Sequence, residues 1–429
     1  HEANVESIDL GRKQVIISHN IGDPTIPMRR NINSDIEQRQ QLHRWQQQQQ
    51  EQGQEPRVVS QMQLQKQQSD RHKHTLNYDY LVIALGSDTN FFGIDSIKKH
   101  AFTMEEIDDA IAIRNHVLEM LEQADLEKAN TELRKSLLTF VIVGGGFNGI
   151  ETVGELNDFV RETVREFYKN IYMTEIKVIL VSASNKILEQ VDDDLGKWAL
   201  QKLKTKGVEF MLNRQVESAT TGDVKLDNGQ TIDTYTIIWS TGVTPSKLIA
   251  ELDCEHDKHH RIVANNHLEL KGYEGTVYAV GDCASVIDPN MGKPYPPTAQ
   301  HALREAKVAA GNLINNIKGY KAKENFDYKT KGMMAEIGKR SGIATLFRGR
   351  IKLHGFIAWW VWRIFYLSNL PTTKKKLKVM SDWTIDLFFK PDVAKIKRRK
   401  LCIGYWAREE NKDKGSEKSV RKAEIQGLG

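Results

Sequence analysis

The feature that most constrains the fold is a glycine-rich stretch near the middle of the chain. An apolar run of β-forming residues, Leu138–Val143, leads directly into three glycines at GxGxxG spacing, and a helical pattern follows. This order predicts a strand, a tight turn and a helix N-terminus whose N–H groups receive a pyrophosphate. Gly144 would permit the turn, Gly146 would let the backbone approach the phosphates, and Gly149 would bring helix and strand together. The alternative is a glycine-rich βα turn without a ligand.

Strand and helix patterns alternate around this stretch. Strands are expected at residues 4–17 (a pair), 81–85, 176–181, 208–212 and 236–242, and helices over residues 105–135, 150–168 and 193–206. The apolar runs at 81–85 and 236–242 suit strands that are buried on both faces. With a hairpin turn at Asp227–Gly229, this alternation predicts an α/β fold with doubly wound parallel sheets and a small antiparallel excursion.

Length and composition limit the class of protein. A chain of 429 residues with 40% hydrophobic residues can bury a large core, and its length indicates two or three domains. Three cysteines without a C-x-x-C pair argue against a disulfide framework or a dithiol redox centre, and favour a reducing compartment: Cys254, Cys283 and Cys402. No apolar run reaches the roughly 18 residues of a membrane span, so we expect no crossing of a bilayer.

A glutamine-rich tract interrupts the first part of the chain. Residues 28–75 contain few large apolar side chains, which predicts a disordered insertion in a surface loop. His72 and His74 end the tract without an acidic or cysteine companion at ligand spacing, so no metal site is expected.

The end of the strand at 176–181 bears on nucleotide choice. An acidic residue usually ends this strand and bonds the ribose 2′-hydroxyl of NAD, whereas this chain has Ser182 there. Ser182, with Ser184 and Lys186, would tolerate a 2′-phosphate, or Ser182 would bond the ribose itself. Both NAD(H) and NADP(H) therefore stay open.

Two later segments suggest a second ligand site. The run Gly275–Val280 delivers Gly281 and Asp282 to a strand end, where open α/β sheets bind ligands. The extended segment Tyr295–Thr298 then leads into a helical run, which would aim backbone N–H groups at a flavin or another anion.

Together these motifs resemble a known family. Tyr78–Ser87, the glycine motif, Ser240–Gly242 and Val277–Asp282 are similar to the two-dinucleotide-domain flavoprotein reductases. With Pro297–Gln300 and Gly355–Trp362, the chain resembles more narrowly the type II (non-proton-pumping) NADH:quinone oxidoreductases.

The resemblance implies FAD as cofactor and a role for individual residues. Gly281 and Asp282 would hold the flavin, and Ala299 and Gln300 would lie between flavin and quinone. Glu151 would lie near the nicotinamide. The remaining implied cofactor contacts are at the dinucleotide-binding turns, where Gly144, Gly146, Gly149, Ser182 and Gly242 lie.

The resemblance also implies the domain organisation. The FAD domain is expected over 1–136 and 256–345, the inserted NAD(P)H domain over 137–255, and a membrane-association region over 346–429. The chain departs from the family in two ways: no GxGxxG precedes Tyr78, so we expect its first strand–turn–helix to be missing, and Glu305 replaces a glutamine expected at the quinone pocket.

The C-terminal region carries its own physical argument. Gly355–Leu370 is densely aromatic but too short to span, and Arg363 interrupts it, which predicts a helix lying in the membrane interface. Basic clusters at Lys374–Lys378 and Lys395–Lys400 would attract anionic lipid. The alternative is a buried core helix with a solvated basic face. A nucleic-acid partner is not expected, because no known binding module accompanies the charges.

The sequence thus predicts a peripheral membrane flavoprotein that passes electrons from NAD(P)H through FAD to a quinone. Glu151 and Gln300 are the candidate catalytic residues. The expected location is the cytoplasmic face of the cell membrane, with a homodimer as a possible assembly. Two alternatives stay open: a soluble NAD(P)H flavin reductase with another acceptor, and a non-catalytic fragment without stable FAD.

Overall fold

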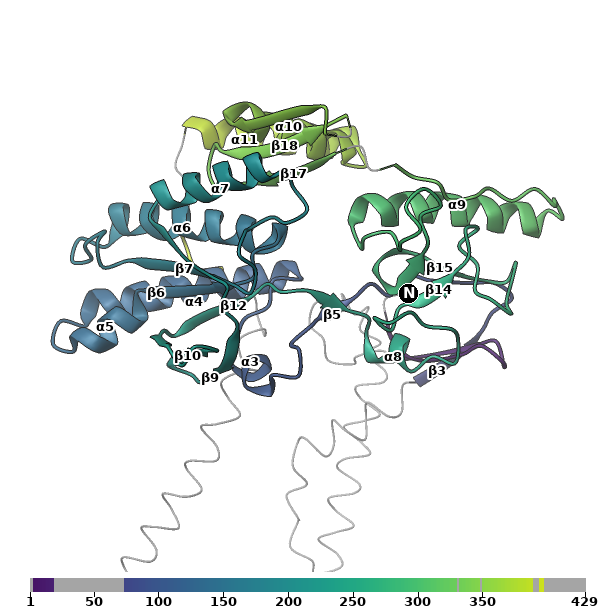
Figure 1. The fold of residues 1–429 in the computed structure, drawn as a ribbon, viewed down its shortest axis with the longest axis horizontal. Coiled ribbons are helices and arrows are strands. Elements are labelled where there is room, and N and C mark those ends of the chain that lie inside the picture. Colours follow the sequence, from purple (N-terminus) through teal and green to yellow (C-terminus); the bar gives the residue numbers. More distant parts are fainter. Residues whose placement is uncertain (1–2, 19–72, 330–331, 348, 389–392, 397–429) are drawn as a thin grey trace, which may run out of the picture. The chain divides into compact units, whose positions relative to one another are not determined.

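The computed structural model describes residues 3–18, 73–329, 332–347, 349–388 and 393–396 (Figure 1). The chain forms two compact units, each built from two segments. Unit 1 comprises residues 1–86 and 245–327, and unit 2 comprises residues 87–244 and 328–429. Most of the predicted glutamine-rich insertion lies outside the described residues. Its last three residues belong to a strand, so the predicted insertion extends too far.

Unit 1 combines small sheets with one long helix. An antiparallel sheet contains β1 (Asn4–Asp9), β2 (Gln14–Ser18) and β3 (Lys73–Asn77). Two parallel pairs are formed by β4 (Leu81–Ile83) with β15 (Val277–Ala279), and by β14 (Ile262–Ala264) with β16 (Ala284–Val286). The helices of this unit within its described residues are α8 (Lys247–Ala250), the 3-10 turn η2 (Gly281–Cys283) and α9 (Ala299–Ile317).

Strand β4 is less buried than its apolar sequence predicts. Ile83 is 2% exposed, but Val82 is 41% exposed and Leu85 is 38% exposed, so burial on both faces was wrong. The physical reason is the size of the sheet, because β15 is the only strand that pairs with β4 among the described residues. One face of this two-stranded ribbon therefore stays open to solvent.

Unit 2 is organised on a four-stranded parallel sheet of order β12-β6-β7-β8. Its strands are β6 (Thr139–Val143), β7 (Lys177–Ser182), β8 (Val208–Leu212) and β12 (Thr236–Trp239). The helices that connect or cover these strands are α3 (Asp95–His100), α4 (Ile107–Leu126), α5 (Thr131–Leu137), α6 (Phe147–Phe167) and α7 (Asp193–Thr205). Alternating βα units thus produce the predicted parallel arrangement.

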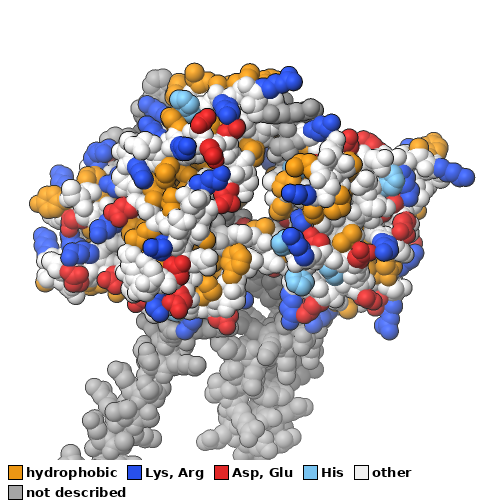
Figure 2. Space-filling model, in the orientation of Figure 1, with side chains coloured by type: hydrophobic (Ala, Val, Ile, Leu, Met, Phe, Trp, Pro, Cys, Tyr) orange, Lys and Arg blue, Asp and Glu red, His pale blue; other side chains and the backbone are white. Residues whose placement is uncertain are grey.

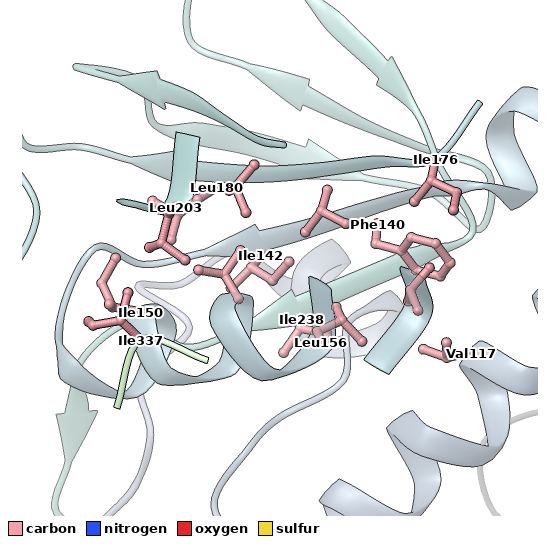
Figure 3. Packing of buried hydrophobic residues seen from close by; sticks show 14 of the residues in the cluster. Val117, Phe140, Ile142, Ile150, Leu156, Ile176, Leu180, Leu203, Ile238 and Ile337 are labelled. Carbon is pink, nitrogen blue, oxygen red and sulfur yellow. The ribbon is translucent and has the colours of Figure 1, made fainter. Parts of the chain in front are cut away.

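Alternate side chains of the sheet enter two different cores. Phe140 and Ile142 point into the larger core with α4, α6 and α7 (Figure 3), whereas Val141 and Val143 point to the opposite face. That second face is covered by α3 and by a three-stranded antiparallel sheet of β9 (Val216–Ala219), β10 (Asp223–Leu226) and β11 (Thr231–Asp233). Because both faces are covered, all five residues of β6 are buried, as a central parallel strand requires.

The predicted crossover helix over 105–135 is two helices. Asn130 caps the N-terminus of α5 by accepting a hydrogen bond from the Leu133 N–H at 3.0 Å. The Glu127 carboxylate accepts the backbone N–H groups of Ala129 and Asn130 at 2.9 Å each. These side-chain bonds satisfy the backbone in the bend, so the single-helix prediction was wrong.

The C-terminal segment joins the same unit. Strands β17 (Met333–Glu336), β18 (Gly342–Leu346) and β19 (Ile351–Gly355) form an antiparallel sheet, followed by α10 (Phe356–Asn369) and α11 (Thr373–Phe388). Ala335, Ile337 and Ile343 lie in the same core as α6. Among the described residues, no helix is both long and apolar enough to cross a membrane.

The compact units divide the chain differently from the predicted domains. Residues 87–136 cluster with the parallel sheet of unit 2 because α4 packs into its larger core. Residues 328–345 also belong to unit 2, together with the region expected to be separate from residue 346 onwards. The short strands β5 (Asp88–Thr89) and β13 (Val243–Thr244) pair with each other where the two chain segments enter and leave this unit.

We predict that Gly149→Ala destabilises unit 2 by on the order of 3 kcal/mol. A Cβ at residue 149 would lie 2.0 Å from the Gly144 carbonyl oxygen, so the helix and strand must separate. Thermal unfolding followed by circular dichroism measures the loss. The matched control is Gly146→Ala, whose Cβ meets no atom within 4 Å and whose φ of −79° suits alanine. Equal melting temperatures for the two variants would contradict this prediction.

Candidate functional site

The glycine turn between β6 and α6 is shaped by two close backbone contacts. Gly144 has φ +128°, and a Cβ there would lie 2.3 Å from the Ser240 carbonyl oxygen. Gly149 faces the Gly144 carbonyl oxygen, and Gly146 borders open space. The first and third glycines of the motif are therefore required by protein packing. The middle one leaves room for another molecule.

The N-terminus of α6 opens toward this turn. Gly146 is the N-cap residue and has no side chain with which to cap the first N–H groups of the helix. Beside the turn, the hydroxyl groups of Ser240 and Thr241 are buried without a hydrogen-bond partner in the described part of the chain. Unsatisfied helix donors and a positive helix end favour an anion at this position.

Ser182 lies underneath the turn and not at its open side. Its side chain is 6% exposed, and its hydroxyl accepts the Ser184 N–H at 3.3 Å. A Cβ at Gly145 would lie 2.6 Å from the Ser182 hydroxyl oxygen, so this second glycine of the run is also required. The sequence analysis missed Gly145, although its place between two motif glycines was a signal.

Gly242 is held by the loop before α3. Its carbonyl accepts the Asn90 N–H at 3.1 Å, and a Cβ there would lie 3.4 Å from the Phe92 ring. With Gly144, Gly146, Gly149 and Ser182, it belongs to unit 2.

A pocket in unit 1 lies beside the N-terminus of α9. It is a small hollow lined largely by small and proline residues: Gly281, Ala284, Val286, Tyr295, Pro296, Pro297, Thr298, His301, Ala302 and Glu305. Gly281 has φ +76°, and a Cβ there would touch the Ala302 side chain at 3.5 Å. The glycine and the first turn of the helix thus pack closely on one side of the pocket.

Glu305 points to the backbone of Gly281. Its carboxylate accepts the Gly281 N–H at 2.7 Å, and the side chain is 4% exposed. Burial raises the pKa of Glu305, and the nearby Asp282 charge raises it further. The carboxylate that the sequence analysis expected at a quinone pocket therefore also supports the turn at Gly281.

The other predicted residues of unit 1 lie around this turn. Asp282 is half-buried in η2, and Ala299 and Gln300 form the start of α9. The Gln300 carbonyl accepts a hydrogen bond from the Arg304 guanidinium at 2.6 Å. The structure thus brings Gly281, Asp282, Ala299 and Gln300 into one unit, as adjacent parts of a strand end and a helix start.

Glu151 is bound by the C-terminal strands of its own unit. One turn into α6, its carboxylate accepts the backbone N–H of Glu336 at 3.0 Å. The Glu336 carboxylate in turn accepts the indole N–H of Trp359 from α10 at 2.6 Å. Glu155 lies one turn further along α6 and is close enough to Glu336 for their charges to interact. Three carboxylates therefore meet where α6, β17 and α10 pack.

Desolvation in this cluster raises the pKa of all three carboxyl groups, those of Glu151, Glu155 and Glu336. Desolvation is the largest cause for Glu151 and Glu336, and repulsion by Glu336 adds to it at Glu151. Desolvation also raises the pKa of Glu155 to about 7, with Glu336 and Asp158 as the next causes. Glu155 nevertheless keeps an exposed surface, so it can exchange its proton with water.

Cationic groups border the three carboxylates. The Arg363 guanidinium lies 3.9 Å from the ring centroid of Trp359 and 4.8 Å from that of Trp383, which joins α10 to α11. Its charge, and that of Lys206, lowers the pKa of both Glu155 and Glu336. Lys206 also binds the Asp158 carboxylate at 2.6 Å. Sequence reasoning missed Glu155 and Glu336, although the spacing of four residues from Glu151 to Glu155 was visible.

The comparisons with known proteins match this architecture. Residues 3–306 match the family described as "Pyridine nucleotide-disulphide oxidoreductase", and residues 330–392 match "NDH2 C-terminal domain". The chain belongs to the type II NADH dehydrogenase family. The resemblance inferred from the motifs is thereby confirmed, and it includes the C-terminal sheet and helices.

Curated relatives support the same assignment. A "Probable NADH dehydrogenase" from Dictyostelium discoideum is 38% identical over 321 residues, which cover 74% of this chain and 69% of that protein. The "Type II NADH:quinone oxidoreductase Ndh" of Mycobacterium tuberculosis is 31% identical over 324 residues, covering 73% and 68%. The matched part is thus about two thirds of the length of each relative.

Solved structures show the same fold. The NDH2 of Plasmodium falciparum in complex with RYL-552 has a TM-score of 0.72 at 18% identity, covering 92% of this chain and 85% of that one. The same protein in complex with NADH has a TM-score of 0.68 at 21% identity, covering 76% and 81%.

We predict that Glu155→Gln stabilises the protein at about pH 8 and leaves stability nearly unchanged at about pH 5. The folded-state pKa of Glu155 is about 7, above the ordinary value of 4.5. Its protonated form therefore supports the fold below about pH 4.5, and that support is lost as the pH rises through 7. Thermal melts at both pH values measure the difference. The matched control is Glu162→Gln on the same helix, where an exposed carboxylate pairs with Lys339. A pH-independent effect of Glu155→Gln would contradict the prediction.

Proposed function

We propose that this chain transfers electrons from NADH to a quinone, with FAD as the carrier, while bound to a membrane surface. The observation that carries the proposal is the open side of the glycine turn at Gly146, in a chain that belongs to the type II NADH dehydrogenase family. Relatives named as NADH:quinone oxidoreductases support the reaction type.

The turn supports binding of a dinucleotide pyrophosphate. Gly146 lets the phosphates approach the backbone, and the first N–H groups of α6 face them at the positive end of the helix. Ser182 lies beneath Gly145, so its hydroxyl supports the turn from below. The acidic Glu189 accepts a hydrogen bond from the Ser184 hydroxyl just beyond β7 and is an additional candidate for ribose recognition.

The pocket at Gly281 offers contacts for part of a flavin. Its lining offers small side chains and the uncapped start of α9, whose N-cap Thr298 makes no side-chain cap. Gly281 and Asp282 would hold the cofactor there, with Ala299 and Gln300 beside its ring. Bound FAD would supply the redox group that accepts a hydride from NADH and passes two electrons to the quinone. Glu305 keeps the Gly281 turn in shape through its bond to the backbone.

The net reaction needs a proton as well as a hydride. NADH and one proton reduce the quinone to a quinol and leave NAD⁺, so two electrons and two protons reach the acceptor. Glu151 is a candidate to position the nicotinamide or to hold this proton, because its pKa is raised by desolvation and by the charge of Glu336.

The two C-terminal helices supply a surface for the membrane. Exposed apolar side chains on α10 are Phe356, Ile357, Trp360, Ile364, Phe365 and Tyr366, and those on α11 are Leu377, Met380 and Ile385. Figure 2 shows hydrophobic side chains together with Lys and Arg over this region. Lys374 and Lys375 are exposed at the start of α11, whereas Lys395 is paired with Glu122 at 2.6 Å. Aromatic rings and free basic groups together suit the interface of an anionic bilayer.

The central test is activity with defined substrates. We expect purified protein supplied with FAD to show flavin absorption bands and to oxidise NADH only when a short-chain ubiquinone is present. Gly146→Ala should raise KM for NADH at least about tenfold with an unchanged melting temperature, because its methyl group enters the phosphate space. Flavin bands without quinone reduction would favour a reductase with another acceptor, and no flavin bands would favour a fragment without stable FAD.

Membrane binding is tested by flotation with vesicles of phosphatidylcholine and phosphatidylglycerol. We expect the double variant Ile357→Glu/Ile364→Glu to lose flotation, because two charges would enter the apolar face of α10. The matched control is Ile107→Glu, since Ile107 on α4 is 78% exposed outside this face. Flotation of the double variant at the level of the control would disprove this surface.

A further inference from the structure

The contacts of Glu336 suggest a function beyond those of the predicted site residues. Glu336 uses two different groups to connect two elements of unit 2. Its backbone N–H binds the carboxylate of Glu151 on α6 at 3.0 Å, and its own carboxylate binds the indole N–H of Trp359 on α10 at 2.6 Å. A single residue of β17 therefore connects the motif glutamate to the first C-terminal helix.

We propose that Glu336 is a positioning residue that holds the Glu151 carboxylate and couples its protonation to the seating of helix α10. The proposal rests on the proposed function only where it assumes that the proton held by Glu151 is used in quinone reduction. The coupling itself is a property of the described contacts and is present without any substrate.

Close packing between α6, the β17–β18 turn and α10 provides the physical basis of this coupling. Trp359 is 1% exposed, so its indole N–H has a fixed direction, and a Cβ on Gly342 would lie 3.1 Å from the Trp359 backbone nitrogen. Gly154 of α6 approaches the Gly338 backbone even more closely, because a Cβ placed at Gly154 would lie 2.6 Å from the Gly338 nitrogen. Helix α6, the β17–β18 turn and α10 are therefore closely packed. A movement of α10 must disturb the hydrogen bond from the Trp359 indole to the Glu336 carboxylate.

The charges around Glu336 act in opposite directions. On α6, Glu151, Glu155 and Asp158 face it with negative charge. Opposing them are Lys206, which follows α7, and Arg363 of α10.

Two further groups of α10 border Glu151. The buried Trp362 indole N–H makes no hydrogen bond within the described residues, but it lies close enough to Glu151 to lower the pKa of that carboxyl group. Desolvation raises the pKa of the Tyr366 hydroxyl, and the Glu151 charge raises it further. Because Trp359, Trp362 and Arg363 all belong to α10, this helix carries most of the groups that favour ionised carboxylates. Its position therefore decides how readily a proton is held at Glu151 and Glu336.

The other notable surface patch does not support a comparable argument. Leu126, Phe167 and Tyr172 are exposed at the far ends of α4 and α6, but no contact or charge indicates what would cover them.

The test is a titration of protonated carboxyl groups by infrared absorption, from about pH 5 to about pH 9, on the full chain with FAD supplied. In Glu336→Gln, we expect the remaining carboxyl titration to move to lower pH, because a like charge beside Glu151 and Glu155 is removed. In Trp359→Phe, we expect the titration of Glu336 to move to higher pH, because the indole N–H that favours its ionised form is lost.

These opposite directions separate the proposal from a general loosening of the packing, which would hydrate all three carboxyl groups and lower their pKa together. Glu162→Gln is the matched control on the same helix and should leave the titration unchanged. An unchanged curve in both variants, or the same shift in the control, overturns the proposal. If Glu336→Gln does not fold, Trp359→Phe decides alone: a shift to higher pH supports the proposal and its absence overturns it.

A kinetic measurement then connects the result to the reaction. We expect the high-pH decline of kcat for quinone reduction to move to lower pH in Glu336→Gln, with KM for NADH unchanged, because Glu151 loses its proton earlier. If wild-type protein does not reduce quinone, the proposed function fails while the infrared titration still decides the coupling. If wild-type protein reduces quinone and the infrared shifts are absent, the coupling fails while the proposed function stands.

Discussion

The carbonyl oxygen of Gly144 occupies the space that any side chain at residue 149 would need, and the rest of unit 2 depends on this contact. It fixes the point at which β6 ends and the direction in which α6 leaves the sheet. That direction leaves the open side of Gly146 in front of the helix N-terminus. It also places Glu151 and Glu155, one and two turns later, against β17. A binding surface for an anion and a group of carboxyl groups with raised pKa therefore both depend on this one backbone contact.

A second close approach, between Gly154 and Gly338, extends the same principle to the C-terminal segment. Two glycine contacts, about one and a half turns apart along α6, let the end of β6 and the β17–β18 turn approach this helix closely. The shared core of Ala335, Ile337 and Ile343 with α6 shows that the C-terminal segment is not a loose attachment. Burial is thus what raises the pKa of the carboxyl groups, and α10 supplies the donor and the cation that oppose this effect.

Local sequence signals predicted much of the sheet of unit 2. Continuous apolar runs gave the positions of β6, β7, β8 and β12, and the glycine spacing gave the turn before α6. Other features of the fold depend on tertiary contacts that these local signals do not report. The exposure of Val82 depends on which strands pair beside it, and the break before Asn130 depends on side-chain bonds to the backbone. Glu336 was beyond prediction, because it meets Glu151 from 185 residues away in the sequence.

The division of the chain has a consequence for the order of folding. All four strands of the parallel sheet of unit 2 lie within one continuous stretch, so they can pair soon after that stretch is synthesised. Strand β4, in contrast, pairs with β15 only after the whole of this stretch has emerged, so its loop closes late. During synthesis, unit 1 therefore exposes an unpaired apolar strand for longer than unit 2 does. This interval leaves the apolar residues of β4 without their partner strand until β15 has been synthesised.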